Sequence, residues 1–278
     1  MEIAPLIHSR TLKCDFNPNF AVRADDVDVS QAMKKILAAM SDVDILNGVR
    51  RLVASNGKIY IAGIAGNFRF FAEKYLKSSE AEEAEKYFYD ERGREIKIFL
   101  GYSFKDGNKN EIPDVNYSTL WKFFKENLAP EWEYTTSKTV IVGYESCSTK
   151  NFSDKTNLKH IGGISFAESS ESNDEKLFAQ CLAERKNLCT NVDQMKIIDS
   201  GEFEVISTTQ SLMNRFESES EKKNPVPQQN TPTQIRDSTT GKDITRRLPK
   251  KKENLTAPAL MIGGAIVAII LIAILLLK

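Results

Sequence analysis

A long uncharged segment lies near the C-terminal end of the chain. From Ala257 to Leu277 no residue is charged, and only Lys278 follows. About 20 apolar residues at about 1.5 Å each span the roughly 30 Å hydrocarbon core of a bilayer, and a helix satisfies its own backbone hydrogen bonds there. We therefore expect residues 257–277 to form a transmembrane tail anchor, with the lipid bilayer as the partner of this segment.

The charge of the chain is balanced overall but unevenly distributed. Of the 38 basic and 38 acidic side chains, 27 and 32, respectively, fall in residues 1–213. Basic residues cluster just before the apolar run, at Lys242, Arg246, Arg247 and residues 250–252. Because basic residues beside a span favour the cytoplasmic side, we expect a single-pass protein with its N-terminal head in the cytoplasm. The acidic head argues against nucleic acid as a partner, since phosphate binding needs a basic surface.

The cysteines and histidines limit the chemistry of the head. The start of the chain shows no charged segment followed by an apolar one, so we expect no signal peptide and reduced thiols. The cysteines are Cys14, Cys147, Cys181 and Cys189. With His8 and His160 as the only histidines, a histidine-based metal site or a Ser-His-Asp triad is not expected. We predict no metal site and no cofactor.

Apolar segments of two kinds alternate along the head. The periodicity predicts helices over 30–40, from 42 or 44 to 56, and over 67–76, 118–128 and 173–188. It predicts strands over 58–64, 95–103, 138–144, 160–166 and 203–207. Residues 1–28 are expected to be irregular, apart from one strand at 20–23. The strands are nearly continuous apolar runs, which is typical of a parallel sheet covered on both faces. We therefore predict an α/β fold with a doubly wound, mostly parallel sheet of the flavodoxin type over residues 1–213.

The composition changes after the head. Over residues 214–256 polar residues and proline dominate, and aromatic residues disappear after Phe216. Such a segment buries too little apolar surface to offset the entropy of ordering it. We predict a flexible polar tether over 214–256, with the basic cluster at its membrane end.

The candidate binding site is a strand followed by a turn with glycines and then a helix. In the sequence IYIAGIAGNFR of residues 59–69, Gly63 and Gly66 would let a ligand approach the backbone. Asn67 would lie at the start of the helix, where free N–H groups and the dipole attract anions, and Arg69 would add charge. The alternative is an ordinary tight turn whose glycines only permit positive φ.

The same segment resembles a known family. Residues 46–76, LNGVRRLVASNGKIYIAGIAGNFRFFAEKYL, look like the opening of a sugar isomerase (SIS) domain. The resemblance implies a doubly wound fold that binds phosphosugars, and it continues at residues 101–111, where Ser103 would belong to a second loop. The first loop departs from the family pattern in having one residue more and Asn67 in the place of a serine.

A second resemblance competes with the first. Residues 97–106, KIFLGYSFKD, are similar to the first strand and loop of TIR-type domains, which also have a flavodoxin-like core. Such domains assemble or cleave NAD with a glutamate, and Glu145 is the nearest acidic candidate here. The alternative is a buried central strand that ends in a polar loop.

Two functions of different classes remain open from the sequence. The first is a ligand-binding or interaction module at the membrane, with an anionic, phosphate-bearing small molecule or a protein as partner. Gly264 and Ala268 form a pair of small residues that would allow two spans to pack closely as a homodimer. The second is an enzyme that acts on a phosphosugar or a nucleotide, including NAD.

The anchor predicts where a truncated chain is found. Deleting residues 255–278 is expected to move the protein from the membrane pellet to the soluble fraction with the head still folded, because the apolar run is removed. Carbonate washing followed by centrifugation measures this distribution. A truncated chain that still pellets would show that another segment binds the membrane.

Overall fold

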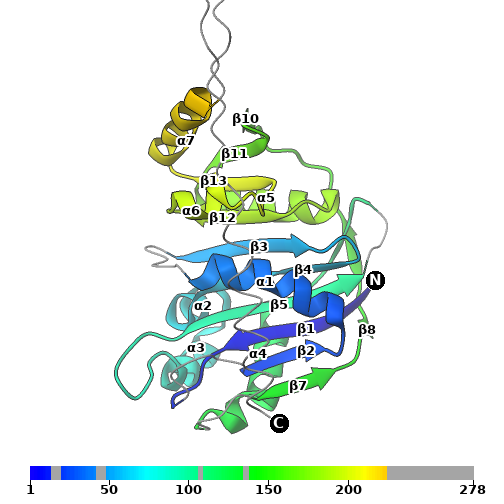
Figure 1. The fold of residues 1–278 in the computed structure, drawn as a ribbon. Coiled ribbons are helices and arrows are strands. Elements are labelled where there is room, and N and C mark those ends of the chain that lie inside the picture. Colours follow the sequence, from blue (N-terminus) through cyan, green and yellow to red (C-terminus); the bar gives the residue numbers. More distant parts are fainter. Residues whose placement is uncertain (14–19, 42–47, 106–108, 134–137, 224–278) are drawn as a thin grey trace, which may run out of the picture. The chain divides into compact units, whose positions relative to one another are not determined.

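The structure of this chain is a computed structural model that describes residues 1–13, 20–41, 48–105, 109–133 and 138–223 (Figure 1). Contacts group Met1–Pro227 into one compact unit, and the second unit, Gln228–Lys278, lies outside the described residues. The anchor at 257–277 and most of the tether are therefore predictions on residues that the structure does not describe. In the described part of the chain, no helix combines the length and the hydropathy that crossing a bilayer requires.

Strands and helices mix throughout the unit, which confirms the α/β class. The strands are β1 Glu2–Ser9, β2 Phe20–Ala24, β3 Val49–Ser55, β4 Ile59–Asn67, β5 Lys97–Lys105, β6 Glu111–Pro113, β7 Thr139–Val142, β8 Glu145–Ser146, β9 Thr149–Asn151, β10 Lys159–Ile161, β11 Ile164–Glu168, β12 Leu188–Val192 and β13 Val205–Thr208. The α-helices are α1 Val27–Ser41, α2 Phe68–Tyr75, α3 Ser78–Ala84, α4 Tyr117–Asn127, α5 Glu171–Glu184, α6 Met195–Asp199 and α7 Gln210–Lys223, with 3₁₀ turns at Glu85–Tyr87 and Ala129–Glu131.

The large sheet has a parallel part and an antiparallel part. Its order is β10-β11-β13-β12-β3-β4-β5-β1-β2-β7, and β8 also pairs with β1. β11, β13 and β12 are parallel to one another, as are β2 and β7. All pairs from β12 through β3, β4, β5 and β1 to β2 are antiparallel. The prediction of a mostly parallel sheet is therefore confirmed for β11-β13-β12 and wrong for the middle of the sheet.

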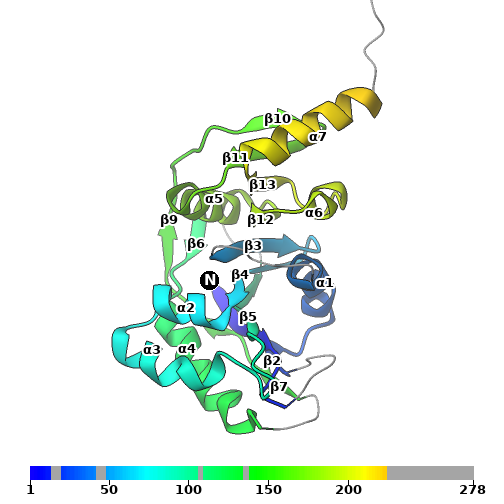
Figure 2. The same cartoon turned by 90° about the vertical axis from the view of Figure 1, so that its left-hand side faces the viewer.

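Helices cover both faces of the sheet, as Figure 2 shows, with α1 and α6 on one side and α2, α3, α4 and α5 on the other. Under α1, Val29 and Ile36 pack against Leu52 and Ile61 of the sheet. The opposite face holds two separate clusters, one under α2 and α4 around Phe68 and one under α5. The helix predicted over 30–40 is confirmed as part of α1, because its apolar residues do form one buried face.

The helix predicted over 44–56 is wrong within the described residues, because Val49–Ser55 forms strand β3. Its residues from Val49 to Ala54 are buried on both faces of the sheet, so apolar residues do not alternate with polar ones. Their spacing therefore resembles the apolar stripe of a helix. Asn56 and Gly57 make a hairpin turn to β4, in which the Asn56 side-chain oxygen accepts hydrogen bonds from the N–H groups of Lys58 and Ile59, both at 3.0 Å. Gly57 has φ of +92°, which suits glycine in such a turn.

The prediction that residues 1–28 are mostly irregular is also wrong. β1 pairs with β5 along nearly all of its length, from Ile3 to Ser9. Its other side pairs only at Glu2–Ile3 with β8 and at Ile7–Ser9 with β2. Pro5 therefore sits where the strand has a neighbour on one side only, which is the place in a sheet that tolerates a proline.

The head also extends beyond its predicted end at residue 213. Helix α7 continues to Lys223, ten residues into the predicted tether. Phe216 of this helix is buried against Phe166 of β11, with ring centroids 5.4 Å apart. The burial of this aromatic ring against the sheet stabilises residues 214–223 as part of the folded head.

Gly63 and Gly101 lie opposite each other on β4 and β5, where the two backbones leave no room for side chains. A Cβ atom on Gly63 would lie 2.5 Å from the Leu100 carbonyl oxygen and 2.7 Å from Cζ of the Phe99 ring. Real Cβ atoms do not approach other atoms this closely. The Phe99 ring can therefore pack over this part of the sheet only because residues 63 and 101 are both glycine.

This packing predicts a difference between two glycine variants. Gly63→Ala is expected to lower the free energy of unfolding by about 1–3 kcal/mol, because the sheet must shift to admit a methyl group. Gly143→Ala is the matched control, since a Cβ there meets no atom within 4 Å. Urea unfolding followed by tryptophan fluorescence measures both values. Equal stabilities would show that the sheet relaxes at no cost.

Candidate functional site

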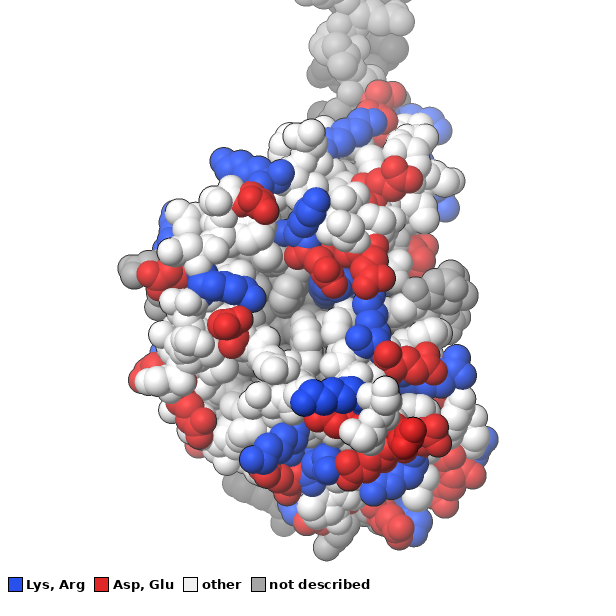
Figure 3. Space-filling model, turned by 180° about the vertical axis from the view of Figure 1, so that it is seen from behind, with Lys and Arg blue, Asp and Glu red and all other residues white. Residues whose placement is uncertain are grey.

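A cleft opens on the face covered by α2, α4 and α5. It encloses about 240 Å³ and is lined by Arg51, Tyr75, Tyr102, Tyr117, Glu175 and Phe178, together with Ile112, Pro113, Val115, Lys150, Ala179 and Leu182. We call it the Arg51 cleft. Figure 3 looks onto this face and shows a hollow with basic and acidic side chains at its edge. The cleft lies where the cluster under α5 meets the cluster under α2 and α4, so one wall comes from each.

Arg51 places a charge at the floor of the cleft. Its side chain is 4% exposed, and its Nη2 donates to Glu175 Oε1 at 2.7 Å, whereas the Glu175 side chain is 56% exposed. The guanidinium carbon also lies 5.9 Å from the centroid of the Tyr75 ring. Arginine has several N–H donors; to the described residues its side chain makes this hydrogen bond to Glu175 and a looser contact to the Tyr75 hydroxyl. The remaining donors are therefore available to a group that enters the cleft.

Three tyrosines line the same cleft. Burial raises the pKa of Tyr75 to about 12, although the nearby Arg51 charge acts in the opposite direction. Burial likewise raises the pKa values of Tyr102 and Tyr117. The Tyr75 hydroxyl is buried close to the positively charged guanidinium of Arg51. It makes no hydrogen bond of normal geometry to a residue in the described part of the chain. All three hydroxyls thus stay protonated at neutral pH and act as neutral hydrogen-bond donors.

The predicted site residues Gly63, Gly66 and Ser103 do not form the expected loop. Gly63 and Gly66 are inside strand β4, which runs on to Asn67. Ser103 is fully buried in β5, where its hydroxyl donates to the Ala4 carbonyl at 3.5 Å. At about 3.3 Å per residue, Gly63 and Asn67 are about 13 Å apart along the strand. The glycines are explained by strand pairing, so the predicted turn is wrong.

The other two predicted residues, Asn67 and Arg69, lie at the start of α2. Asn67 is the N-cap residue, but its side-chain nitrogen donates to the carboxylate of Glu95. The first helical N–H group, that of Phe68, donates to the Ile96 carbonyl at 2.8 Å. Arg69 lies beside Glu73 at 3.6 Å. An acidic side chain therefore occupies the place where the sequence predicted an anion.

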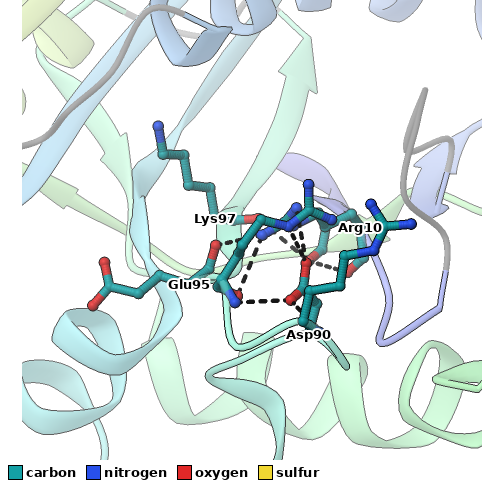
Figure 4. A network of polar contacts seen from close by, with 7 residues as sticks. Arg10, Asp90, Glu95 and Lys97 are labelled. Atoms are coloured by element: carbon teal, nitrogen blue, oxygen red, sulfur yellow. Dashed lines mark hydrogen bonds and ion pairs between the residues drawn. The ribbon is translucent and has the colours of Figure 1, made fainter.

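Glu95 belongs to a polar network that closes the adjacent loop (Figure 4). Arg10 donates to the Glu95 carbonyl at 2.6 Å and pairs with Asp90 at 3.3 Å. Burial raises the pKa of Asp90, but hydrogen bonds from Arg94 outweigh it, and the net pKa is lowered. The network joins β1 to the loop before β5, so we interpret it as a structural contact.

Two further expectations concern metals and acids. Among the residues that the structure describes, no group of three or more His, Cys, Asp or Glu side chains could hold a metal ion. Glu145 is exposed in β8 and does not line the Arg51 cleft. Asp174 of α5, in contrast, is buried; its Oδ2 accepts from the Ser169 hydroxyl at 3.0 Å, and its Oδ1 has no hydrogen-bond partner in the described chain. Burial raises the pKa of Asp174, and the neighbouring hydroxyls of Ser207 and Ser169 act against it.

The Arg51 cleft was not predicted from the sequence. Its one signal was a pair of charged residues, Arg50 and Arg51, inside an apolar run. Charged residues are almost never fully buried without partners, so arginines in a core strand mark a polar site. Cys181 of α5 and Cys189 of β12 are free, buried thiols.

Comparison with protein-family models, with curated proteins and with solved structures gave no match. The function of this chain therefore has to be inferred from its own geometry.

A second cavity contains His8. It encloses about 340 Å³ between α1 and strands β1, β2 and β7, and Met33 and Leu37 form part of its wall. Burial lowers the pKa of His8 from 6.5 to about 4. A third cavity of about 570 Å³, between α1 and α6, contains Lys35 and Glu202, which pair at 3.2 Å.

His8 predicts a pH dependence of stability. As the pH falls from 6.5 to about 4, the unfolded chain takes up a proton at His8 that the folded chain refuses, so stability falls across this window. The loss is at most about 3.5 kcal/mol, because one pKa unit corresponds to about 1.4 kcal/mol. His8→Gln is expected to flatten the dependence of the unfolding free energy on pH in that range. Parallel profiles for wild type and variant would contradict the assignment.

Proposed function

We propose that this chain is a membrane-anchored module that binds a small molecule in the Arg51 cleft. The observation that carries the proposal is a nearly buried arginine with unused donors, set among aromatic side chains. Binding sites for small molecules combine apolar walls with a few polar groups that converge on the ligand. The cleft has this composition, whereas one of the two larger cavities contains the ion pair of Lys35 and Glu202 and the other lies beside His8, which is neutral at neutral pH.

The anchor is the second part of the proposal. Residues 257–277 hold the head at a bilayer as a single-pass span, and the basic cluster before it keeps the head in the cytoplasm. A flexible tether over the residues that follow α7, 224–256, has a root-mean-square reach of about 30 Å. The head therefore samples ligand or a protein partner close to the membrane.

An enzyme that acts on a phosphosugar or nucleotide is the second candidate. Asp174 favours it, since a carboxylic acid with a raised pKa and an unused oxygen is a common acid or base in catalysis. Two observations favour binding over catalysis. Asp174 does not line the Arg51 cleft, and the glycines of the expected phosphate loop are inside a strand.

A variant that fills the cleft tests this proposal. Ala179→Phe places a ring in the cleft and is expected to abolish ligand binding, because Ala179 forms part of its wall. Ala38→Phe on α1 is the matched control on the opposite face. The full-length protein in detergent is screened by thermal shift against neutral aromatic compounds, aromatic acids, nucleotides and sugar phosphates.

At least one compound is expected to stabilise the wild type and Ala38→Phe but not Ala179→Phe. A compound that stabilises all three proteins equally would place the site elsewhere. If no compound stabilises the wild type, the binding proposal fails.

A further inference from the structure

We propose that the Arg51 cleft takes a planar aromatic anion, a single ring that carries one phosphate or carboxylate group, and that this group replaces Glu175 on the guanidinium of Arg51. This inference rests on the proposed function and names the ligand chemistry of the same site.

The ion pair of Arg51 and Glu175 is unequal in its environment. Arg51 is held at the floor of the cleft, with its backbone N–H donating to the Thr190 hydroxyl at 2.7 Å. Glu175 is more than half exposed at the edge. When the carboxylate turns away it regains water, whereas Arg51 cannot leave. An unpaired buried charge is costly, so the empty cleft favours any anion that can take the place of Glu175.

The groups around Arg51 suit an anion. Tyr75, Tyr102 and Tyr117 line the same cleft, the charge of Arg51 acts on the hydroxyls of Tyr75 and Tyr117, and all three hydroxyls remain protonated at neutral pH. Hydroxyl and guanidinium donors that meet at a partly desolvated place form charge-assisted hydrogen bonds, which are stronger than neutral ones. Lys150 lines the same cleft and adds positive charge, although it also pairs with Asp114 at 3.1 Å.

The walls suit a ring. Tyr75 and Tyr117 lie with ring centroids 4.8 Å apart, and Phe178 comes from α5 to line the same cleft. Aromatic side chains bind rings in stacked or edge-to-face arrangements. The volume of about 240 Å³ is below the usual range for drug-sized ligands, so it suits one ring and excludes a dinucleotide.

If the ligand anion displaces Glu175 from Arg51, removing the charge of Glu175 increases the affinity for anions. A pocket without this competition would show no such increase. Glu175→Gln removes the competing carboxylate and is expected to tighten the binding of phenyl phosphate and of benzoate by about two- to fivefold, the range for an exposed ion pair. Glu217→Gln is the matched control, since Glu217 pairs with Lys159 at 2.7 Å on another part of the head. It is expected to leave both affinities unchanged.

Isothermal titration of the full-length protein in detergent with phenyl phosphate, benzoate, inorganic phosphate and phenol measures these affinities. Phenyl phosphate is expected to bind at least about tenfold more tightly than phenol, which lacks the charge. Arg51→Ala is expected to remove that preference. Because this variant removes a buried side chain and can fail to fold, the Glu175→Gln titration decides the question independently.

Several results would overturn the inference. Phenol that binds as tightly as phenyl phosphate would reduce the cleft to an apolar pocket. Weaker anion binding by Glu175→Gln would show that Glu175 contacts the ligand and does not compete with it. If only neutral compounds occupy the cleft in the thermal-shift screen, the proposed function stands and the anion exchange fails; if nothing occupies it, both fail.

Discussion

Two adjacent arginines in β3 hold the two parts of the sheet together. Arg50 has no exposed surface, and its guanidinium meets four acceptors from α1 and from β12 and the turn after it. They are the carbonyl oxygens of Ala39, Thr190 and Asn191 and the carboxylate of Asp193, at 2.7–3.1 Å. A buried charge costs several kcal/mol unless such partners compensate it. The contact is therefore stable only when α1, β3 and β12 are all in place.

This joint also determines where the cleft forms. β3 and β12 are the pair at which the antiparallel part of the sheet meets the parallel part, and they pair only at Leu188 and Cys189. Because successive side chains of a strand point to opposite faces, the residue that follows Arg50 is directed to the other face. Arg51 thus lies between α5 of the parallel part and α2 of the antiparallel part. The same constraint that joins the sheet leaves a charged residue at the bottom of a gap between helices.

The sequence predicted the amphipathic helices and the strong strands well. α1, α4 and α5 each have a single buried stripe, and β4 and β5 are long apolar runs, so local periodicity was sufficient. It failed where tertiary contacts override the pattern. β3 is buried on both faces, so its apolar and polar residues do not alternate as in a half-buried strand. Pro5 argues against a strand at β1, and it is tolerated there only because β2 and β8 leave a gap beside it, which the sequence does not show. Asn56-Gly57 is a strong hairpin signal, and it was interpreted as the end of a helix. Without the hairpin, β3 and β4 were not recognised as antiparallel neighbours, and the glycines of β4 were assigned to a phosphate loop.

The cleft could not be predicted at all, since its walls come from residues more than 120 positions apart, such as Arg51 and Glu175.

The position of β1 has a consequence for how the chain reaches this state. β1 is the first strand along the chain, yet its main partner, β5, begins at Lys97, and β8 follows only at Glu145. During synthesis Ile7 can pair early with Val22 of β2, but Ile3 and Leu6 emerge long before their partners in β5 and β8. Strand pairs with such sequence separation form slowly, because the intervening loop must close first. The N-terminal part of β1 thus lacks its main partner until β5 has been made, and chaperones that recognise extended apolar peptides can bind it during that interval.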